Sequence, residues 1–417
     1  MPDKKTLILL TDFFPFEAYE PYLENEFKYL SEAFEKIFIF SASEKQKAIY
    51  DLPANILYYN FPANIQMSSK VNALLSFDKG LFKTEKKFVN SGLQQKMDLI
   101  KIKIMIMEYF KAKMLKKYIK KTLHEELKNQ GNILIYSYWC DYKAIAAALL
   151  KKEFPRMKAI SRAHGWDVYF ERNTAGYLPL RTFLFNTLDK VFFVSENGKA
   201  YTSAKFDDPS KFALAHLGTN QPAQPITEQK KEPFHIVSCS SLIPLKRIRL
   251  LIAAIALLPQ DIEILWTHFG DGILMNEIVR LCQKKLSPMI NVHVDLEGYV
   301  SNDEVLKFYA ENNVNLLVNT SSTEGLPVTM MEAMSGAIPV IGTNVGGVGE
   351  IIKDNFNGFL LSANPEPKEI TEKIVSFINM SGEKYSQFRR NAFETWNTKY
   401  NAAVNFPSFI EEIKQDI

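Results

Sequence analysis

Short apolar runs alternate with segments of helical periodicity through both halves of the sequence. In the first half, the apolar runs Thr6–Leu10 and Ile37–Phe40 flank a segment that places Leu23, Phe27 and Leu30 on one helical face. Helices that alternate with strands carry the chain back to the start of the next strand, which makes neighbouring strands parallel. We therefore predict an α/β fold built from doubly wound parallel sheets.

A polar, proline-containing stretch over residues 218–233 interrupts this alternation, which restarts at His235–Ser238. The stretch has the composition of a linker. The chain of 417 residues is also longer than one domain of the usual ~100–200 residues. We predict a first domain over residues 1–220, a linker over residues 221–233 and a second domain over residues 234–395.

The composition is that of a globular protein, with 47% hydrophobic and 23% charged residues, and the net charge of +3 is too small to indicate a partner. The three cysteines lie far apart without metal-ligand spacing, which favours a reducing compartment over a disulfide framework. The first apolar run is cut by Asp12 and lacks a signal-peptide cleavage site. The longest runs, such as Leu250–Pro259, are shorter than the ~20 residues of a membrane-spanning helix. We expect a cytoplasmic protein that meets a membrane only at its surface.

The segment Lys101–Lys121 carries eight lysines and a single acid, Glu108, with apolar residues at helical spacing between them. One interpretation is a core-facing helix with a solvated lysine face. The other is docking on anionic lipid headgroups. Nucleic acid is not expected as a partner, because no stacking motif or known binding module accompanies the charge.

The segment Val318–Gly336 runs from a strand through a turn into a helix, with Pro327 suited to the first helical position. A helix start offers free N–H groups and a positive dipole end to an anion. Glu324 precedes the helix and Glu332 lies more than one turn inside it, so the two carboxylates can accept hydrogen bonds at different places. Gly325 allows a ligand close to the backbone. The pattern fits a nucleotide-sugar, which has a diphosphate between two sets of hydroxyls.

The C-terminal half resembles the retaining GT-B glycosyltransferases of family 4, the group 1 transferases of exopolysaccharide and lipopolysaccharide synthesis. The resemblance extends from Ser301 to Leu361 and is carried by Glu324-Gly-Leu-Pro, Glu332-Ala-Met-Ser-Gly-Ala-Ile-Pro-Val, Gly346-Gly-Val-Gly-Glu350 and Asn357-Gly-Phe359. It implies two Rossmann-like domains that face a central cleft. It also implies that a C-terminal helix within residues 396–417 packs back on the first domain.

The resemblance also implies roles for individual residues. Glu324 would contact the donor hexose and Glu332 would hold the ribose hydroxyls. The turn at Gly298 and Tyr299 would bind the base through its backbone. The positions whose backbone groups would bind sugar or diphosphate oxygens are Gly325, Leu326, Pro327, Gly346 and Gly347.

The family neutralises the leaving diphosphate with a basic pair, and this chain departs from that pattern. A Gly-Arg dipeptide is expected where Ser240-Ser241 stand. Lys246 matches the motif, whereas Arg247 stands where glycine is common and is a replacement for the missing arginine. Without a metal-binding Asp-x-Asp, the diphosphate needs fixed cations, so we expect no metal and no other cofactor. Solvated helix-start residues are the alternative for this pair.

In the first domain, His164 follows the strand near Lys158–Ser161, at the end where open α/β sheets bind ligands. A lone histidine is more often a core residue, but Arg162, Trp166 and Asp167 surround it with polar and aromatic groups. The resemblance implies that His164 donates or accepts a hydrogen bond with the donor sugar from across the cleft.

The loop after the first strand lacks the glycine-rich turn of many family members. We expect Glu20 or Glu24 to reach an acceptor hydroxyl there. Either residue could instead be an acid favoured by a helix dipole.

We therefore expect a retaining hexosyltransferase that moves a sugar from a nucleotide diphosphate donor to a saccharide or lipid-linked acceptor in surface polysaccharide synthesis. The alternative is a catalytically degenerate GT-B scaffold, which the missing arginine and missing glycines support. A nicotinamide oxidoreductase is less favoured than either, because Asp12-Phe-Phe-Pro follows the first strand without a Gly-x-Gly-x-x-Gly fingerprint.

Overall fold

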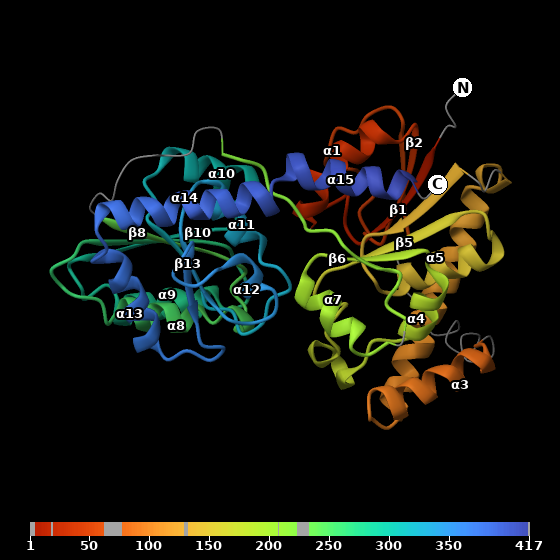
Figure 1. Cartoon of the computed structure of the whole chain (residues 1–417), viewed down its shortest axis with the longest axis horizontal. Helices are drawn as coiled ribbons and strands as arrows, with labels where there is room; N and C mark the ends of the chain where they lie inside the picture. The colour runs from red at the N-terminus through yellow and green to blue at the C-terminus, as the bar shows by residue number, and fades with distance from the viewer. Residues whose placement is uncertain are drawn as a thin grey trace. The chain divides into compact units, whose positions relative to one another are not determined.

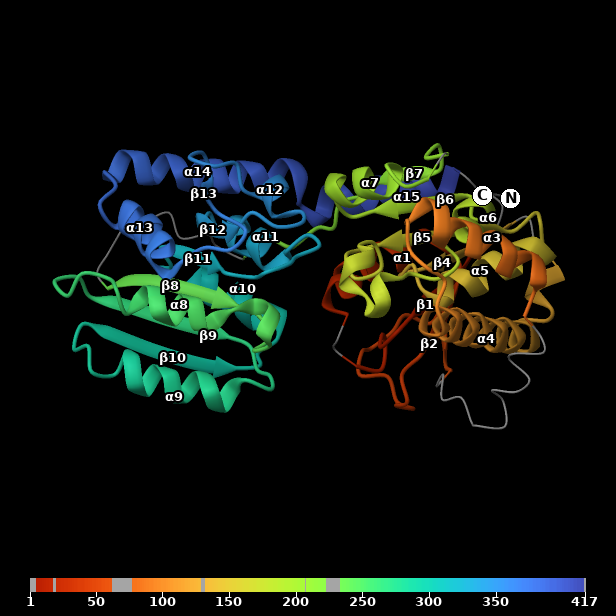
Figure 2. The same ribbon diagram turned by 90° about the horizontal axis from the view of Figure 1, so that it is seen from below.

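The computed structural model describes residues 5–17, 20–61, 77–128, 132–206, 208–222 and 233–415. It divides into two compact units: unit 1 comprises Met1–His216 and Phe406–Ile417, and unit 2 comprises Leu217–Asn405. Each unit holds a parallel sheet with helices packed on it (Figure 1; Figure 2), which confirms the predicted fold class. Most of the predicted linker, residues 223–232, lies outside the described residues.

Unit 1 contains a seven-stranded parallel sheet with the order β3-β2-β1-β4-β5-β6-β7. Its strands are β1 (Thr6–Thr11), β2 (Lys36–Ser41), β3 (Ile56–Asn60), β4 (Ile133–Ser137), β5 (Lys158–Ala163), β6 (Lys190–Phe193) and β7 (Phe212–Leu214). The order reverses between β1 and β4, where Leu10 lies opposite Ser137. Ligands of open α/β sheets bind beyond the carboxyl ends of the strands at such a point.

The helices of unit 1 cover both faces of this sheet. They are α1 (Pro21–Ala33), α3 (Lys79–Lys87), α4 (Leu99–Thr122), α5 (Tyr142–Glu153), α6 (Arg181–Thr187), α7 (Glu196–Ser203) and the part of α15 (Ala402–Gln415) that begins at Phe406, with short turns η1 (Phe88–Gly92), η2 (Glu126–Lys128), η4 (Phe170–Arg172) and η5 (Thr174–Gly176).

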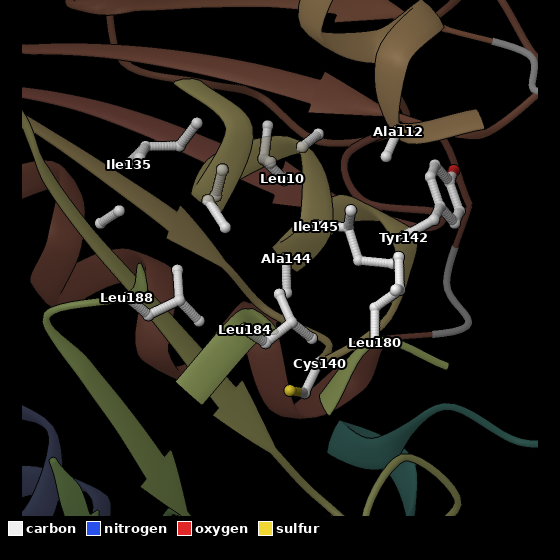
Figure 3. Close-up of a cluster of buried hydrophobic side chains, with 14 of the residues drawn as sticks. Leu10, Ala112, Ile135, Cys140, Tyr142, Ala144, Ile145, Leu180, Leu184 and Leu188 are labelled. Carbon is white, nitrogen blue, oxygen red and sulfur yellow. The ribbon is translucent and has the colours of Figure 1, made fainter. Parts of the chain in front are cut away.

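Alternate residues of β1 enter two separate cores, because successive side chains of a strand point to opposite faces. Ile8 and Leu10 pack with α4, α5 and α6, and Figure 3 shows Leu10 and Ile135 in this layer with Leu184 of α6. Leu7 and Leu9 pack with apolar residues of α1 and α15 on the other face.

Helix α4 covers residues 101–121 and confirms the predicted helix there. It buries one stripe, which includes Met105, Tyr109, Ala112, Leu115 and Ile119. Four of its lysines form ion pairs: Lys101 with Asp98, Lys111 with Glu108, and Lys116 and Lys120 with Glu153. The helix is therefore a core-facing element, and much of its positive charge is balanced within unit 1.

Unit 2 contains a six-stranded parallel sheet with the order β10-β9-β8-β11-β12-β13. Its strands are β8 (Phe234–Cys239), β9 (Ile264–Phe269), β10 (Val292–Gly298), β11 (Leu316–Asn319), β12 (Val340–Thr343) and β13 (Gly358–Leu361). Its helices are η6 (Pro244–Lys246), α8 (Ile248–Ile255), α9 (Met275–Lys285), α10 (Asn302–Glu311), α11 (Val328–Ser335), α12 (Val348–Ile351), α13 (Pro367–Ile378) and α14 (Gly382–Lys399). The strand order reverses between β8 and β11, so the turns that follow these two strands meet.

The capping box predicted at the start of α10 is present: Ser301 accepts from the N–H of Glu304, and Glu304 accepts from the N–H of Ser301. Among the helices that the structure describes, none is both long and apolar enough to cross a bilayer.

Candidate functional site

Two turns meet at the point in unit 2 where the strand order reverses. One follows β8 and ends in η6, and the other follows β11 and leads into α11. Pro327 is the N-cap of α11, one residue earlier than the predicted first helical position, because its ψ of 107° is extended. The first N–H groups of a helix have no partner within it. The start of α11 therefore has the donors that an anion site needs.

Lys246 and Glu324 come together in these turns. The Nζ atom of Lys246 lies 2.7 Å from Oε1 of Glu324. The side-chain amide of Asn319 donates to the same oxygen at 3.2 Å. Glu324 is only 9% exposed, so the lysine charge compensates a nearly buried carboxylate. A lysine ammonium has three donors, which leaves two for a further acceptor.

Arg247 does not follow the prediction. Its guanidinium donates to the carbonyl oxygens of Thr320, Ser321 and Ala363 and to Oδ1 of Asn364. Four of its five N–H donors are therefore used within unit 2, and desolvation lowers its pKa. The residue fastens the turn that carries Lys246 to the ends of β11 and β13. In this structure Arg247 acts as a structural clamp, whereas Lys246 faces Glu324.

Glu332 lies within α11 and is 3% exposed. Burial raises the pKa of its carboxyl to about 7. A hydrogen bond from Asn302 lowers this pKa, but the effect of burial is larger. The amide nitrogen of Asn302 donates to Oε1 of Glu332. Sequence reasoning missed Asn302, and its position directly after the capping Ser301 was the available signal. The pair forms a partly buried polar site that can receive hydroxyl donors.

Two glycine turns were predicted to bind the donor, and these turns lie in contact with each other. The N–H of Gly347 donates to the carbonyl of Gly325 at 2.8 Å. A Cβ atom on Gly347 would lie 2.4 Å from that carbonyl oxygen, so only glycine fits. Gly346 has a left-handed φ of 54°. Leu326 is buried and completes this joined turn.

The turn predicted to bind the base lies at the end of β10. Gly298 has a left-handed φ of 67°, and its carbonyl accepts from the N–H of Gly270 at 2.7 Å. Tyr299 is 65% exposed. The ring of Tyr299 is thus free of the core, as a residue at a ligand-facing turn would be.

In unit 1, His164 follows β5 and is buried. Its Nε2 lies 2.9 Å from the carbonyl oxygen of Tyr138. A carbonyl only accepts, so Nε2 carries the proton and Nδ1 keeps a lone pair. Burial lowers the pKa of His164 to about 4, which keeps the ring neutral at pH 7. Asp167 fixes the turn by accepting from the N–H groups of His164 and Gly165.

Arg162 lies two residues before His164, and its sequence position suggested that it surrounds His164 in the polar turn. The structure instead places Arg162 in the core. Its side chain is fully buried, pairs with Glu26 and lies over the ring of Phe409. Because side chains alternate along a strand, Arg162 and Ala163 point to opposite faces of β5.

Glu20 is not placed as predicted. It is 1% exposed and accepts four hydrogen bonds, from the N–H groups of Asp12, Phe13 and Phe14 and from the indole of Trp139. No side-chain cap to α1 involves it. The carboxylate substitutes for the missing glycine turn by organising the loop after β1. Glu24 accepts from the hydroxyl of Tyr50, so both acids serve unit 1 itself.

Most of unit 2 is similar to a known protein family. Residues 220–395 match the family described as glycosyl transferases group 1. By this match, the segment is similar to the group 1 glycosyl transferases. The match includes every motif of unit 2 described above.

Individual proteins are similar to this chain over more residues than the segment 220–395. A glycosyltransferase of Methanocaldococcus jannaschii is 29% identical over 256 residues, which are 61% of this chain and 67% of the relative. A poly(ribitol-phosphate) alpha-N-acetylglucosaminyltransferase of Staphylococcus aureus is 26% identical over 219 residues, 51% of this chain and 42% of the relative. The chain thus matches less than half of the length of the second relative.

The solved structure of Anabaena HepE with UDP and glucose is similar over 99% of this chain and 100% of its own, with a TM-score of 0.65 and 14% identity. At this identity the likeness shows the fold, which is GT-B: two Rossmann-like domains, the second of which contains the matched segment. Within the described ranges, no three His, Cys, Asp or Glu side chains are grouped as a metal site would require.

Proposed function

We propose that the chain is a retaining, metal-independent glycosyltransferase of the EC 2.4 class that moves a hexose-type sugar from a nucleotide diphosphate donor to a saccharide or lipid-linked acceptor. The observation that carries the proposal is the ion pair of Lys246 and Glu324 beside the start of α11. A cation and a helix start suit a diphosphate, and a carboxylate beside them suits sugar hydroxyls.

The remaining donor contacts follow from the same unit. Asn302 and Glu332 form a partly buried polar pair that suits the two ribose hydroxyls. Gly298 and Tyr299 would receive the base through the backbone of their turn. The complex of HepE with UDP supports uridine as that base.

In the proposed reaction, the acceptor hydroxyl oxygen forms a bond to the anomeric carbon on the face from which the diphosphate leaves. The bond from the anomeric carbon to the diphosphate oxygen breaks, and that oxygen takes the proton of the acceptor hydroxyl. Lys246 stabilises the charge that develops on the leaving diphosphate. His164 is neutral, so its proposed contribution is a hydrogen bond accepted at Nδ1 from a donor-sugar hydroxyl, which rests on the family resemblance.

The proposed setting is surface polysaccharide synthesis at the cytoplasmic side of a membrane. The S. aureus relative is named for transfer to poly(ribitol-phosphate), which supports a polymeric acceptor. Lys103, Lys117 and Lys121 are the exposed lysines of α4 and would make the contact with an anionic surface. Co-sedimentation with anionic and neutral vesicles tests this contact, and equal binding to both contradicts it.

The test of the activity is a panel of nucleotide-sugars with the purified protein and a panel of saccharide acceptors. We expect transfer from a UDP-hexose, a product with the anomeric configuration of the donor by NMR, and full activity in excess EDTA. An inverted product contradicts the retaining reaction, and loss of activity in EDTA that added metal restores contradicts metal independence.

A degenerate GT-B scaffold is the second candidate. It is favoured by the engagement of Arg247 with backbone carbonyls, which leaves the diphosphate end of the site with fewer cations than the family pattern. Calorimetry with UDP separates the two candidates, because a degenerate site gives no binding and a transferase site does.

A further inference from the structure

Unit 1 contains a pocket of about 700 Å³ that includes none of the residues predicted from the sequence to bind donor or acceptor. Residues that follow three strands of the sheet contribute to it: Asp12 after β1, Asp141 after β4 and Trp166 after β5. The pocket thus lies at the carboxyl ends of the strands, where the strand order reverses. This is the edge at which open α/β sheets bind ligands.

One side of the pocket is suited to hydroxyl groups. Oδ1 of Asp12 and Oδ2 of Asp141 lie 2.6 Å and 2.5 Å from the Nζ atom of the buried Lys143. Two carboxylates share one ammonium, and burial raises the pKa of Asp141 to about 7. Asp12 has a partly exposed side chain whose Oδ2 has no partner among the described residues. That oxygen can accept a hydrogen bond from a ligand hydroxyl.

An indole ring stands beside these carboxylates. Trp166 is 43% exposed and lines the pocket. A large flat ring with an exposed apolar face matches the C–H face of a pyranose. Carboxylate acceptors and an exposed indole together suit a saccharide.

The other side of the pocket comes from the first half of α4. Its apolar residues Ile100, Ile104 and Met107 line the pocket together with the charged Lys103, Glu108 and Lys111. Ile100 is 56% exposed and Leu99, which precedes it, is 83% exposed. Exposed apolar side chains that continue into a pocket mark a surface for an apolar ligand.

The walls of the pocket are held in place by buried hydrogen bonds. Glu85 of α3 accepts from the hydroxyl of Tyr177 at 2.7 Å and from the N–H of Leu180 at 2.8 Å. The amide nitrogen of Asn173 donates to the carbonyl of Trp166 at 2.5 Å. A site whose walls are fixed before binding loses less entropy when it is filled.

A row of aromatic rings connects the pocket to His164. The centroids of Trp166 and Trp139 are 5.7 Å apart, and those of Trp139 and His164 are 4.4 Å apart. Glu20 holds the middle ring through the indole N–H of Trp139 at 2.6 Å. The pocket therefore begins next to the residue to which the family resemblance gives a donor-sugar contact.

We propose that this pocket is the acceptor site and that the acceptor is amphiphilic. Its saccharide end lies against Asp12 and Trp166, and its apolar aglycone lies along Ile100, Ile104 and Met107. The proposal rests on the proposed transferase function, because a transferase needs a second substrate site. Glu20 is a positioning residue of this site and does not touch the acceptor.

The test uses direct binding to the full chain, with n-octyl β-D-glucoside below its micelle concentration as the probe. Methyl β-D-glucoside has the same sugar without the chain, and tetraethylene glycol monooctyl ether has the same chain without the sugar. We expect octyl glucoside to bind at least about tenfold more tightly than either, by ligand-observed NMR titration, because burial of several methylenes adds to the sugar contacts.

Two variants locate the site. Ile100→Glu should abolish the advantage of octyl glucoside over methyl glucoside, whereas Trp166→Ala should weaken both glucosides. Ile290→Glu is the matched control, because Ile290 is 95% exposed in unit 2, and it should bind like wild type. UDP binding should be the same in all of these proteins.

Equal binding of the three probes, no binding of octyl glucoside, or an equal effect of Ile100→Glu and Ile290→Glu would overturn the proposal. The UDP measurement keeps it apart from the proposed function. If UDP binds and the pocket variants behave like wild type, the acceptor proposal fails alone. If UDP does not bind, the transferase function fails.

Discussion

Lys246 and Glu324 are 78 residues apart in the sequence, and their side chains meet at 2.7 Å between Nζ and Oε1. The two turns that carry them follow β8 and β11, the strands at which the order of the second sheet reverses. Arg247 fixes one turn to the other through the carbonyl oxygens of Thr320 and Ser321. The ion pair is therefore built on a rigid base. In our account, it becomes the point at which the donor sugar and its diphosphate are bound.

The neighbouring residues Lys246 and Arg247 should respond differently to substitution. Lys246→Ala should lower kcat of the folded protein by roughly 100-fold or more, because the cation at the reacting diphosphate is lost. Arg247→Ala should destabilise unit 2 by about 2–4 kcal/mol, because its carbonyl partners lose their donor. Steady-state kinetics and urea unfolding measure the two effects. Lys284→Ala, on α9, is the control for loss of a lysine. A Lys246→Ala protein with the wild-type kcat, or an Arg247→Ala protein as stable as wild type, would contradict this division of roles.

Uridine binding should depend on pH through Glu332. Burial raises the pKa of this carboxyl to about 7. The charged form accepts hydrogen bonds from ribose hydroxyls at both oxygens, so affinity should rise with pH. For a pKa of about 7, the charged fraction rises roughly tenfold from pH 6 to pH 8, and the association constant should follow it. Calorimetry or NMR titration with uridine, which has no phosphate to titrate in this range, measures the effect. The same pH dependence in Glu332→Gln would show that another group is responsible.

His164 should stay neutral throughout the physiological range. Burial lowers its pKa to about 4, so the ring charges only below that pH. NMR titration of the His164 ring should show no change between pH 5.5 and pH 8. His164→Ala should lower kcat/KM by roughly 10-fold to 100-fold, as expected for one lost hydrogen bond to a substrate. A ring that titrates near 6.5 would contradict the buried, Nε2-protonated form.

Glu20 should matter for stability. Glu20→Ala removes the acceptor of four hydrogen bonds in the loop after β1 and should lower the free energy of unfolding by about 2–4 kcal/mol. Glu32→Ala, at an exposed position of α1, should have almost no effect. Urea unfolding of both variants tests the structural role. If Glu20→Ala is as stable as Glu32→Ala and loses only acceptor affinity, the original sequence prediction of direct acceptor contact is correct.

Gly347 should tolerate no side chain. A Cβ atom would lie 2.4 Å from the carbonyl oxygen of Gly325, so Gly347→Ala must separate the two joined glycine turns. We expect at least about a tenfold loss of UDP affinity, or a loss of about 1–3 kcal/mol of stability if the turns cannot move. Gly382→Ala is the control, because a Cβ there meets no atom within 4 Å. Unchanged UDP binding and stability in Gly347→Ala would contradict the joined turns.

Local periodicity was sufficient to predict the fold. The alternation of strands and helices, the helix over residues 101–121 and the capping box at Ser301 are determined by nearby residues, and the structure confirms them. The two motifs that contain Lys246 and Glu324 were recognised through their resemblance to a known family, and the structure places both in turns that follow strands.

Long-range contacts of individual side chains could not be predicted. Arg247 has the charge of a diphosphate ligand, but the carbonyl oxygens that hold it belong to residues about 70 or more positions away. Glu20 has the chemistry of an acceptor contact, but Trp139 and the loop after β1 use it. The pocket beside Trp166 depends on α4 and three strand ends that the sequence separates widely. Sequence periodicity does not predict such contacts between distant residues.

The most direct test of the central claim is the release of UDP from a UDP-hexose panel by wild type, Glu324→Gln and Glu372→Gln, with thermal unfolding measured for each. Glu372 is an exposed acid of α13 and serves as the control. We predict turnover by wild type and Glu372→Gln, and a loss of roughly 100-fold or more in a Glu324→Gln protein that is still folded. Turnover by Glu324→Gln at the wild-type rate, or no turnover of any nucleotide-sugar by wild type, would contradict the account.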